Sequence, residues 1–240
     1  MTLYDRIGRS YARHRAAEPA IEERIKAAFG DAVNVVNVGA GTGSYEPRDR
    51  ICVAVEPSPV MIEQRPPNAA PVVAAFAEAL PFADDTFDVA MAVLTVHHWN
   101  DPEAGLREMR RVASRVVIFG FDLVALHERF WLIRDYLPEL LTLESGSPTV
   151  ERAAEITGAA SIESVPLPAT CRDGFMPAYW ARPEAYLDPS VRSAISVFHR
   201  LDPAIVRRMV MKLSEDLGSG RWDKRYGSLR DTKELELGFR

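Results

Sequence analysis

Short, continuous apolar runs recur along the first half of the chain and alternate with segments of helical spacing. These runs cover residues 33–38, 51–55, 72–75, 87–93 and 115–121, and the run at 87–93 contains few polar residues. A strand that is apolar on both faces is typical of a parallel sheet covered by helices on either side. We therefore predict an α/β fold in which these five runs are strands of a mainly parallel sheet.

Helical periodicity and capping signals place the helices. Apolar residues recur at helical spacing over residues 18–29, which predicts an amphipathic helix. Asp101 precedes Pro102, and a capping side chain followed by proline predicts a helix start. The same order recurs at residues 147–148, 188–189 and 202–203.

Two more strands are expected in the less regular second half. Residues 162–167 are mainly apolar, and Pro166 places them near a sheet edge, because proline cannot donate to the ladder. Residues 235–239 alternate between apolar and polar side chains, which favours a last strand. The predicted fold is a Rossmann-like, doubly wound sheet of about seven mostly parallel strands.

Composition and charge narrow the class of protein. The net charge of the 240 residues is −5 and no dense basic run occurs, which argues against nucleic acid as a partner. Cys52 and Cys171 form no metal-binding or redox spacing, which fits a reduced cytoplasmic compartment. No metal site is expected, because no third ligand accompanies His97 and His98 at a recognisable spacing. The sequence also shows neither a signal peptide nor an apolar segment of membrane-spanning length. We expect a cytoplasmic protein that does not bind a membrane, as a monomer or homodimer.

The most informative stretch follows the first strand. Residues 35–43 read Val-Val-Asn-Val-Gly-Ala-Gly-Thr-Gly, so a buried strand leads directly into a loop with three alternate glycines. Glycine lets the backbone turn sharply and lets a ligand approach without a Cβ in the way. The second strand ends in Glu56, whose carboxylate can accept both hydroxyls of a ribose. Taken alone, the pattern fits a nucleotide-like ligand and a plain tight turn equally well.

The glycine spacing separates the nucleotide classes. A dinucleotide fingerprint places its third small residue three positions after the second glycine, which here is Ser44. Gly43 instead comes one position early, and no phosphate cradle of the Walker type is present. A nicotinamide oxidoreductase is therefore the less favoured reading.

A second block of motifs lies around the fourth strand. Residues 77–82 read Ala-Glu-Ala-Leu-Pro-Phe, residues 87–88 read Phe-Asp, and residues 97–98 are two histidines. With the glycine loop and Glu56, in this order, the block resembles the class I S-adenosylmethionine-dependent methyltransferases, and in particular the subgroup that includes ubiquinone and menaquinone biosynthesis enzymes. The resemblance covers roughly residues 30–122, so what it implies rests on analogy.

The resemblance implies S-adenosylmethionine as cofactor and a set of residues that hold it. The glycine loop would surround the methionine end, Glu56 would hold the ribose, and Pro57 and Met61 would flank the adenine. Leu94 would lie under the methionine chain. The implied cofactor-binding residues are Tyr11, Arg15, Gly39, Ala40, Gly41, Gly43, Glu56, Pro57, Met61, Ala77 and Leu94.

Three features depart from the family pattern. Phe76 stands where many relatives have an Asp that takes the adenine amino group, and Asn37 replaces a common acid. Residues 44–50 are too few, and are interrupted by Pro47, for the usual helix between the first two strands. We expect a single turn or no helix there.

The two histidines are the candidate catalytic groups. Methyl transfer is an in-line displacement that needs no metal, and a base helps only when the acceptor must lose a proton. His97 and His98 follow a central strand at the end where open α/β sheets bind ligands. If the strand geometry persists that far, the two side chains point to opposite sides, and we favour His98 as the base. The alternative is that both histidines are structural.

The predicted organisation is one domain over residues 1–240. Residues 1–122 would form the cofactor-binding half, residues 123–233 a helical lid that binds the acceptor, and residues 234–240 the last strand. Aromatic residues of the second half indicate a small, partly apolar acceptor, methylated on O, N or C, and we place it by association in secondary metabolism. Asp122, His127, Asp135 and Asp173 are further polar candidates. The non-enzyme alternative is a degenerate methyltransferase fold that only binds S-adenosyl ligands.

Overall fold

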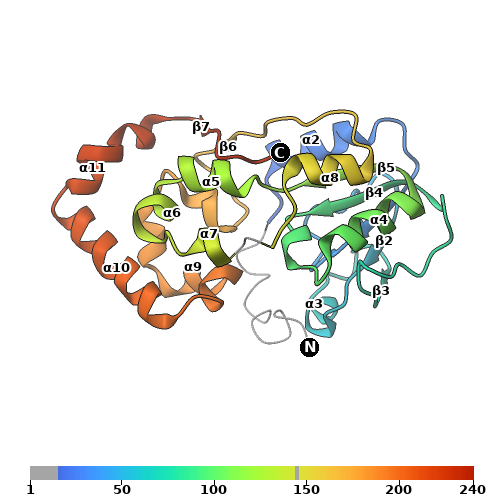
Figure 1. Cartoon of the computed structure of the whole chain (residues 1–240), viewed down its shortest axis with the longest axis horizontal. Helices are drawn as coiled ribbons and strands as arrows, with labels where there is room; N and C mark the ends of the chain where they lie inside the picture. The colour runs from blue at the N-terminus through green and yellow to red at the C-terminus, as the bar shows by residue number, and fades with distance from the viewer. Residues whose placement is uncertain (1–15, 144–145) are drawn as a thin grey trace.

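A five-stranded parallel sheet forms the centre of one lobe of the molecule (Figure 1). The computed structural model describes residues 16–143 and 146–240. The strand order is β3-β2-β1-β4-β5, and the strands are β1 (Asn34–Val38), β2 (Ile51–Val55), β3 (Val72–Val73), β4 (Phe87–Val93) and β5 (Ala113–Phe119). These are the five runs predicted from the apolar pattern, and the doubly wound, Rossmann-like class is confirmed.

The predicted strand count of about seven is wrong for this sheet. The two remaining strands, β6 (Leu167–Pro168) and β7 (Glu234–Leu235), pair antiparallel in a separate two-stranded sheet. Beyond β7 the chain runs antiparallel to the segment that follows β5, where Gly120 and Arg240 exchange two backbone hydrogen bonds of 3.0 Å. Two prolines, Pro166 and Pro168, lack N–H donors there, so only a two-residue ladder forms.

Helices cover both faces of the central sheet. Alternate residues of β1 and β4 point to opposite faces, as a strand requires. Val35 and Met91 belong to the core that includes α2 (Pro19–Phe29). Val36 and Ala90 belong to the core that includes α4 (Pro102–Val112). The remaining helices of this lobe are α3 (Pro59–Glu63) and α8 (Val150–Thr157), and α8 packs on α4.

The helix starts follow the capping signals of the sequence. The side chain of Asp101 accepts a hydrogen bond from the backbone N–H of Ala104 at the start of α4. Asp188 and Asp202 cap α9 (Pro189–Ser193) and α10 (Pro203–Gly218) in the same way. The signal at residues 147–148 is displaced, because Thr149 caps α8.

The second lobe is helical and has an aromatic core. Figure 1 shows it as a layer of helices beside the sheet lobe. The indole N–H of Trp131 donates to the carbonyl of Trp180, and that of Trp180 donates to the carbonyl of Leu167. Besides α9 and α10, its helices are α5 (Leu123–Arg129), α6 (Trp131–Tyr136), α7 (Leu140–Leu143) and α11 (Arg221–Tyr226). Within the described ranges, no helix combines the length and the apolar character that crossing a bilayer demands.

Candidate functional site

A cleft opens at the carboxyl ends of β1, β2 and β4, where open α/β sheets bind ligands. Its empty volume is about 1710 Å³, including the open mouth. The segment after β1, the end of β2, the residues after β3 and the short 3-10 helix after β4 contribute its walls. The described lining residues are Asn37, Gly39, Ala40, Gly41, Thr42, Ser44, Tyr45, Glu56, Pro57, Met61, Phe76, Ala77, Glu78, Val93, Leu94, Thr95, His97, His98, Trp99, Asn100 and Arg200.

The glycine loop adopts a backbone that only glycine tolerates well. Gly39, Gly41 and Gly43 have φ values of 71°, 53° and 88°. The start of the loop is fixed because the N–H groups of Gly39 and Ala40 both donate to the carbonyl at the end of β2. A Cβ at Gly39 would lie 2.1 Å from the Thr95 hydroxyl oxygen, whereas one at Gly41 would meet only the end of Met61. The loop is therefore packed against Thr95 at Gly39, whereas Gly41 faces the cleft.

Glu56 is held in one orientation by the backbone. Its Oε2 accepts a hydrogen bond of 2.8 Å from the N–H of Gly41, and its Oε1 accepts one of 2.9 Å from the N–H of Ser58. The residue is 6% exposed and lines the cleft. The carboxylate thus links the glycine loop to the segment that follows β2.

A buried ion pair supports the loop where a helix was expected to be short or absent. Residues 42–50 contain only turns and bends, as predicted. Arg65 and Glu46 form a 2.6 Å ion pair in which both side chains are 5% exposed. Arg65 also donates to the carbonyl of Gly41, and Asn37 donates to Glu46. The polar side chain at Asn37 thus serves the ion pair from the end of β1.

The far end of the cleft has an apolar and aromatic wall. Met61 is buried on α3, and Phe76 is 49% exposed at the cleft wall. Trp99 packs against Gly105 of α4, where a Cβ would lie 2.4 Å from the indole ring. A flat ring bound at this end would therefore meet apolar surface.

An apolar pocket adjoins the cleft between the two lobes. Leu94, His97 and His98 line both spaces, and the pocket has an empty volume of about 710 Å³. Leu94 has a positive φ of 52°, which among the described non-glycine residues only Asp85 shares. No Asp, Glu, Lys or Arg is among the described residues lining this pocket, which are Leu94, His97, His98, Phe121, Leu123, Leu126, Ile133, Leu140, Phe175, Met176, Pro177, Ala194, Ile195, Ser196, Val197 and Phe239.

The histidines do not point to opposite sides, which corrects the expectation from strand geometry. Strand β4 ends at Val93, and residues 96–98 form a 3-10 helix, so the alternation of a strand no longer applies. The two imidazole rings lie 3.9 Å apart between centroids, and the His97 ring lies 5.0 Å from that of Phe121. Both histidines therefore face the boundary between the cleft and the pocket.

Most of the residues predicted for the site line one cleft. Gly39, Ala40, Gly41, Glu56, Pro57, Met61, Ala77, Leu94, His97 and His98 do so, whereas Gly43 shapes the loop without lining it. Tyr11 and Arg15 lie outside the described residues. Asp122 caps α5, Asp135 pairs with Arg225, and neither these nor His127 and Asp173 lines the cleft or the pocket.

Several residues that line the cleft were not predicted from the sequence. Tyr45 and Thr95 flank the recognised motifs, and their proximity to the glycine loop was the only available signal. Arg200 comes from the helical lobe, follows a short 3-10 helix and donates to the carbonyl of Leu143. Among the described cleft residues it is the one lysine or arginine. No local pattern marks it, because its place depends on how the lobes pack. In the described part of the chain, no three His, Cys, Asp or Glu side chains are grouped so as to hold a metal ion.

Comparison with known proteins agrees with this geometry. Residues 36–119 match the family model of a methyltransferase domain. The chain is 31% identical over 140 residues to a demethylmenaquinone methyltransferase of Corynebacterium efficiens, a match that covers 57% of this chain and 58% of that protein. The chain therefore spans less than two thirds of the length of this curated relative.

Two solved structures extend the similarity to the whole fold. A putative methyltransferase from an antibiotic biosynthesis pathway of Anabaena variabilis has a TM-score of 0.84 at 28% identity, covering 94% of this chain and 96% of that one. A possible histamine N-methyltransferase from Thermotoga maritima has a TM-score of 0.54 at 26% identity, covering 69% of this chain and 84% of that one. The helical lobe as well as the sheet lobe thus has a counterpart in a solved structure.

Proposed function

We propose that this chain acts as a class I S-adenosylmethionine-dependent methyltransferase, the family that the matching domain model and the similar proteins indicate, and that it methylates O, N or C of a small, partly apolar molecule. The observation that carries the proposal is that the cleft and the apolar pocket share Leu94, His97 and His98. A ligand in the cleft and one in the pocket would therefore meet at these residues. Such a meeting point is what in-line transfer between two bound molecules requires.

The residues of the cleft fit S-adenosylmethionine. A side chain at Gly41 would occupy the open cleft, so its absence leaves room for the ligand to approach the backbone. A carboxylate offers about four acceptor sites, so Glu56, oriented by two N–H groups, can take both ribose hydroxyls. Pro57, Met61, Phe76 and the backbone of Ala77 would enclose the adenine. When bound, the cofactor supplies an electrophilic methyl group on a sulfonium.

The lining of the pocket supports one class of acceptor. Its described walls are apolar side chains, with His97, His98 and Ser196 as the polar exceptions. Burying a charged group there without a partner would be costly, so the pocket favours an uncharged molecule with an apolar body. The Anabaena variabilis structure, described as belonging to an antibiotic biosynthesis pathway, supports an acceptor from secondary metabolism.

The histidines are placed to move a proton. One of them would accept a proton from the acceptor atom if that atom carries one, while the pocket walls exclude water from the reacting centre. Leu94, with its positive φ, holds the turn that brings the histidines to this boundary. The proposed roles are thus Glu56 and the glycine loop in binding, Leu94 in shaping the turn, and His97 or His98 as base.

Titration calorimetry tests the cofactor assignment. We expect S-adenosylhomocysteine to bind and NAD not to bind measurably, and tighter binding of NAD would refute the proposal. Glu56→Gln should weaken S-adenosylhomocysteine roughly tenfold to a hundredfold, the range for hydrogen bonds to a charged group. The amide cannot accept from both the Gly41 and Ser58 N–H groups through two oxygens. An unchanged affinity would remove Glu56 from the site.

Release of S-adenosylhomocysteine in the presence of apolar acceptors tests the activity. We expect release from S-adenosylmethionine with a neutral, apolar acceptor and not with a charged analogue of similar size. Tight cofactor binding without turnover by any acceptor would favour a protein that only binds S-adenosyl ligands.

A further inference from the structure

The hydroxyl group of Tyr45 joins three segments that are far apart in the sequence. It donates a 2.9 Å hydrogen bond to Asp173 Oδ2 and accepts one of 3.2 Å from the backbone N–H of Glu18. The Glu18 carboxylate accepts a 2.8 Å hydrogen bond from the backbone N–H of Arg172. Tyr45 is 5% exposed and Asp173 is fully buried. A directional, buried network therefore fixes the segment around Asp173 against the segment around Tyr45.

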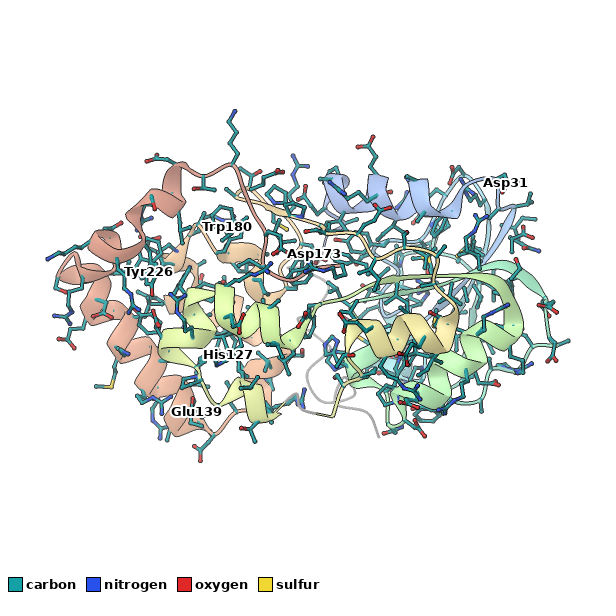
Figure 2. All side chains as sticks on the ribbon, turned by 45° about the horizontal axis from the view of Figure 1, so that its top comes forward. Asp31, His127, Glu139, Asp173, Trp180 and Tyr226 are labelled. Atoms are coloured by element: carbon teal, nitrogen blue, oxygen red, sulfur yellow. The ribbon has the colours of Figure 1, made fainter. Side chains whose placement is uncertain are left out.

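The two ends of this network belong to the two halves of the proposed site. Tyr45 comes two residues after Gly43, the last glycine of the glycine loop, and its side chain lines the cleft. Asp173 precedes Phe175 by two residues, and its carbonyl accepts a hydrogen bond from the N–H of Phe175. Phe175, Met176 and Pro177 form a wall of the apolar pocket. Asp173 lies where the sheet lobe and the helical lobe meet (Figure 2).

A contact that only held the two lobes together would not need the carboxyl group of Asp173. Burying a polar group is costly unless its hydrogen bonds are made, and an apolar pair of similar size would hold the lobes together without that cost. A hydrogen bond differs from an apolar contact because it specifies one relative position of the two segments. The geometry of the Tyr45–Asp173 bond thus constrains where the pocket wall stands relative to the glycine loop.

We propose that Tyr45 and Asp173 are positioning residues through which cofactor binding at the glycine loop orders the pocket wall at residues 175–177. The proposal rests on the proposed function of the cleft. A ligand that immobilises the loop after Gly43 immobilises the Tyr45 side chain, and the Asp173 bond extends this order to Phe175. The acceptor then meets a wall that is already formed, so it bears a smaller entropic cost of ordering.

Hydrogen exchange with saturating S-adenosylhomocysteine tests this coupling. In the wild type the ligand should slow exchange in peptides covering residues 39–46 and also in those covering residues 173–180. In Tyr45→Phe the first effect should persist. The slowing at 173–180 should fall roughly threefold to tenfold, the equivalent of one lost hydrogen bond. Asp173→Asn keeps an acceptor oxygen for the Tyr45 hydroxyl, so it should retain more of the response.

Tyr186→Phe is the matched control. Its hydroxyl donates to the carbonyl of Met176, so the variant removes a tyrosine hydrogen bond from the same wall without touching the glycine loop. Exchange at 173–180 should be faster in this variant with and without ligand, and the ligand-induced slowing should remain. Thermal unfolding of each variant verifies that it is folded at the temperature of the measurement.

The outcomes separate this inference from the proposed function. A wild type that does not bind S-adenosylhomocysteine would overturn both. A wild type that binds it without slowing exchange at 173–180, or a Tyr45→Phe variant with the full wild-type response, would overturn the coupling alone. Loss of all binding in Tyr45→Phe would make Tyr45 a ligand contact and would also overturn its positioning role.

Discussion

At the scale of single residues, Gly39 is the position of the glycine loop where a side chain would meet both an unfavourable backbone conformation and a close neighbour. Its φ of 71° and the Thr95 hydroxyl 2.1 Å from the place of a Cβ act together against any side chain. We predict that Gly39→Ala lowers the free energy of unfolding by about 1–2 kcal/mol for the left-handed backbone. Overpacking should add about 1–3 kcal/mol. Chemical denaturation measures the loss, and calorimetry should show weaker binding of S-adenosylhomocysteine.

Gly158 provides the control for this prediction. Its φ of 66° is similar, but a Cβ there would have no neighbour within 4 Å. Gly158→Ala should therefore show only the backbone cost and should leave ligand affinity unchanged. Equal destabilisation of the two variants would mean that the Thr95 side chain moves aside and that its clash with the new Cβ costs no stability.

His97 and His98 lie side by side, so either of them can be the base and a variant of each is needed. His97→Ala and His98→Ala should each be compared, because both rings face the boundary of cleft and pocket. If one is the base, its removal should lower turnover by roughly 10²–10⁴-fold. Affinity for S-adenosylhomocysteine should barely change, since the base would act on the acceptor.

His199 is the matched control for the histidine variants. It lies outside both lining sets and its Nε2 is 2.8 Å from the carbonyl of Ser193. His199→Ala should keep wild-type turnover. Normal turnover in well-folded His97→Ala and His98→Ala variants would exclude a histidine base, and both residues would then be structural.

At the scale of elements, the crossover between β1 and β2 depends on a buried ion pair and not on a helix. Arg65 of the segment after α3 reaches Glu46 and the Gly41 carbonyl, so it holds the β1–β2 crossover, which itself contains no helix. Removing one partner of such a pair leaves a buried charge without its counterion, at a cost of about 3–5 kcal/mol. We predict that Arg65→Met lowers the free energy of unfolding by that amount, as measured by denaturation.

A double-mutant comparison checks that the pair causes the loss. Arg65→Met combined with Glu46→Leu should be less destabilised than Arg65→Met alone, because no unpaired charge is left. The half-buried pair of Lys26 and Glu22 on α2, whose side chains are 40% and 32% exposed and lie 2.7 Å apart, provides the contrast. Glu22→Gln should change stability by less than about 0.5 kcal/mol. Strictly additive losses at Arg65 and Glu46 would contradict the role of the pair.

At the scale of the whole molecule, the burial of the two cysteine thiols makes the stability of the fold depend on pH. Burial raises the pKa of the Cys52 thiol and that of the Cys171 thiol, each to about 12. The pKa of a cysteine thiol in the unfolded chain is about 8.5. Above that pH the unfolded chain releases protons that the folded chain retains, so unfolding becomes easier. The stabilising effect is complete below about pH 8.5 and is lost as the pH rises toward 12.

We therefore predict that the free energy of unfolding falls between pH 9 and 12. Each thiol should contribute up to about 1.4 kcal/mol per pH unit to that slope. Equilibrium denaturation at a series of pH values measures it. The double variant Cys52→Ala/Cys171→Ala should have a shallower slope, although it is less stable near neutral pH. An identical slope in the double variant would show that both thiols are open to solvent in the folded chain.

The features that could be predicted from the sequence are those whose geometry depends on residues close together in the chain. The strand before Gly39, the alternate glycines and Glu56 at the end of β2 lie within about twenty residues of each other. Their geometry follows from backbone preference and from the parallel pairing of β1 with β2. The missing helix at residues 44–50 could be predicted as well, because the segment is too short for one.

The tertiary structure decided what depends on contacts between distant segments. The sheet has five strands because the last two pair with each other, and the apolar pattern does not specify which partner a short strand takes. The histidines share one boundary because a 3-10 helix replaces the strand after Val93. Arg200, the Glu46–Arg65 pair and the Tyr45–Asp173 bond were not predictable, because no local pattern records which side chains packing brings together. The sequence by itself thus determined the five strands of the sheet and the glycine loop that leads into the cleft, because both follow from local patterns. The packing of the two lobes decided the shape of the apolar pocket, because its walls come from segments far apart in the chain.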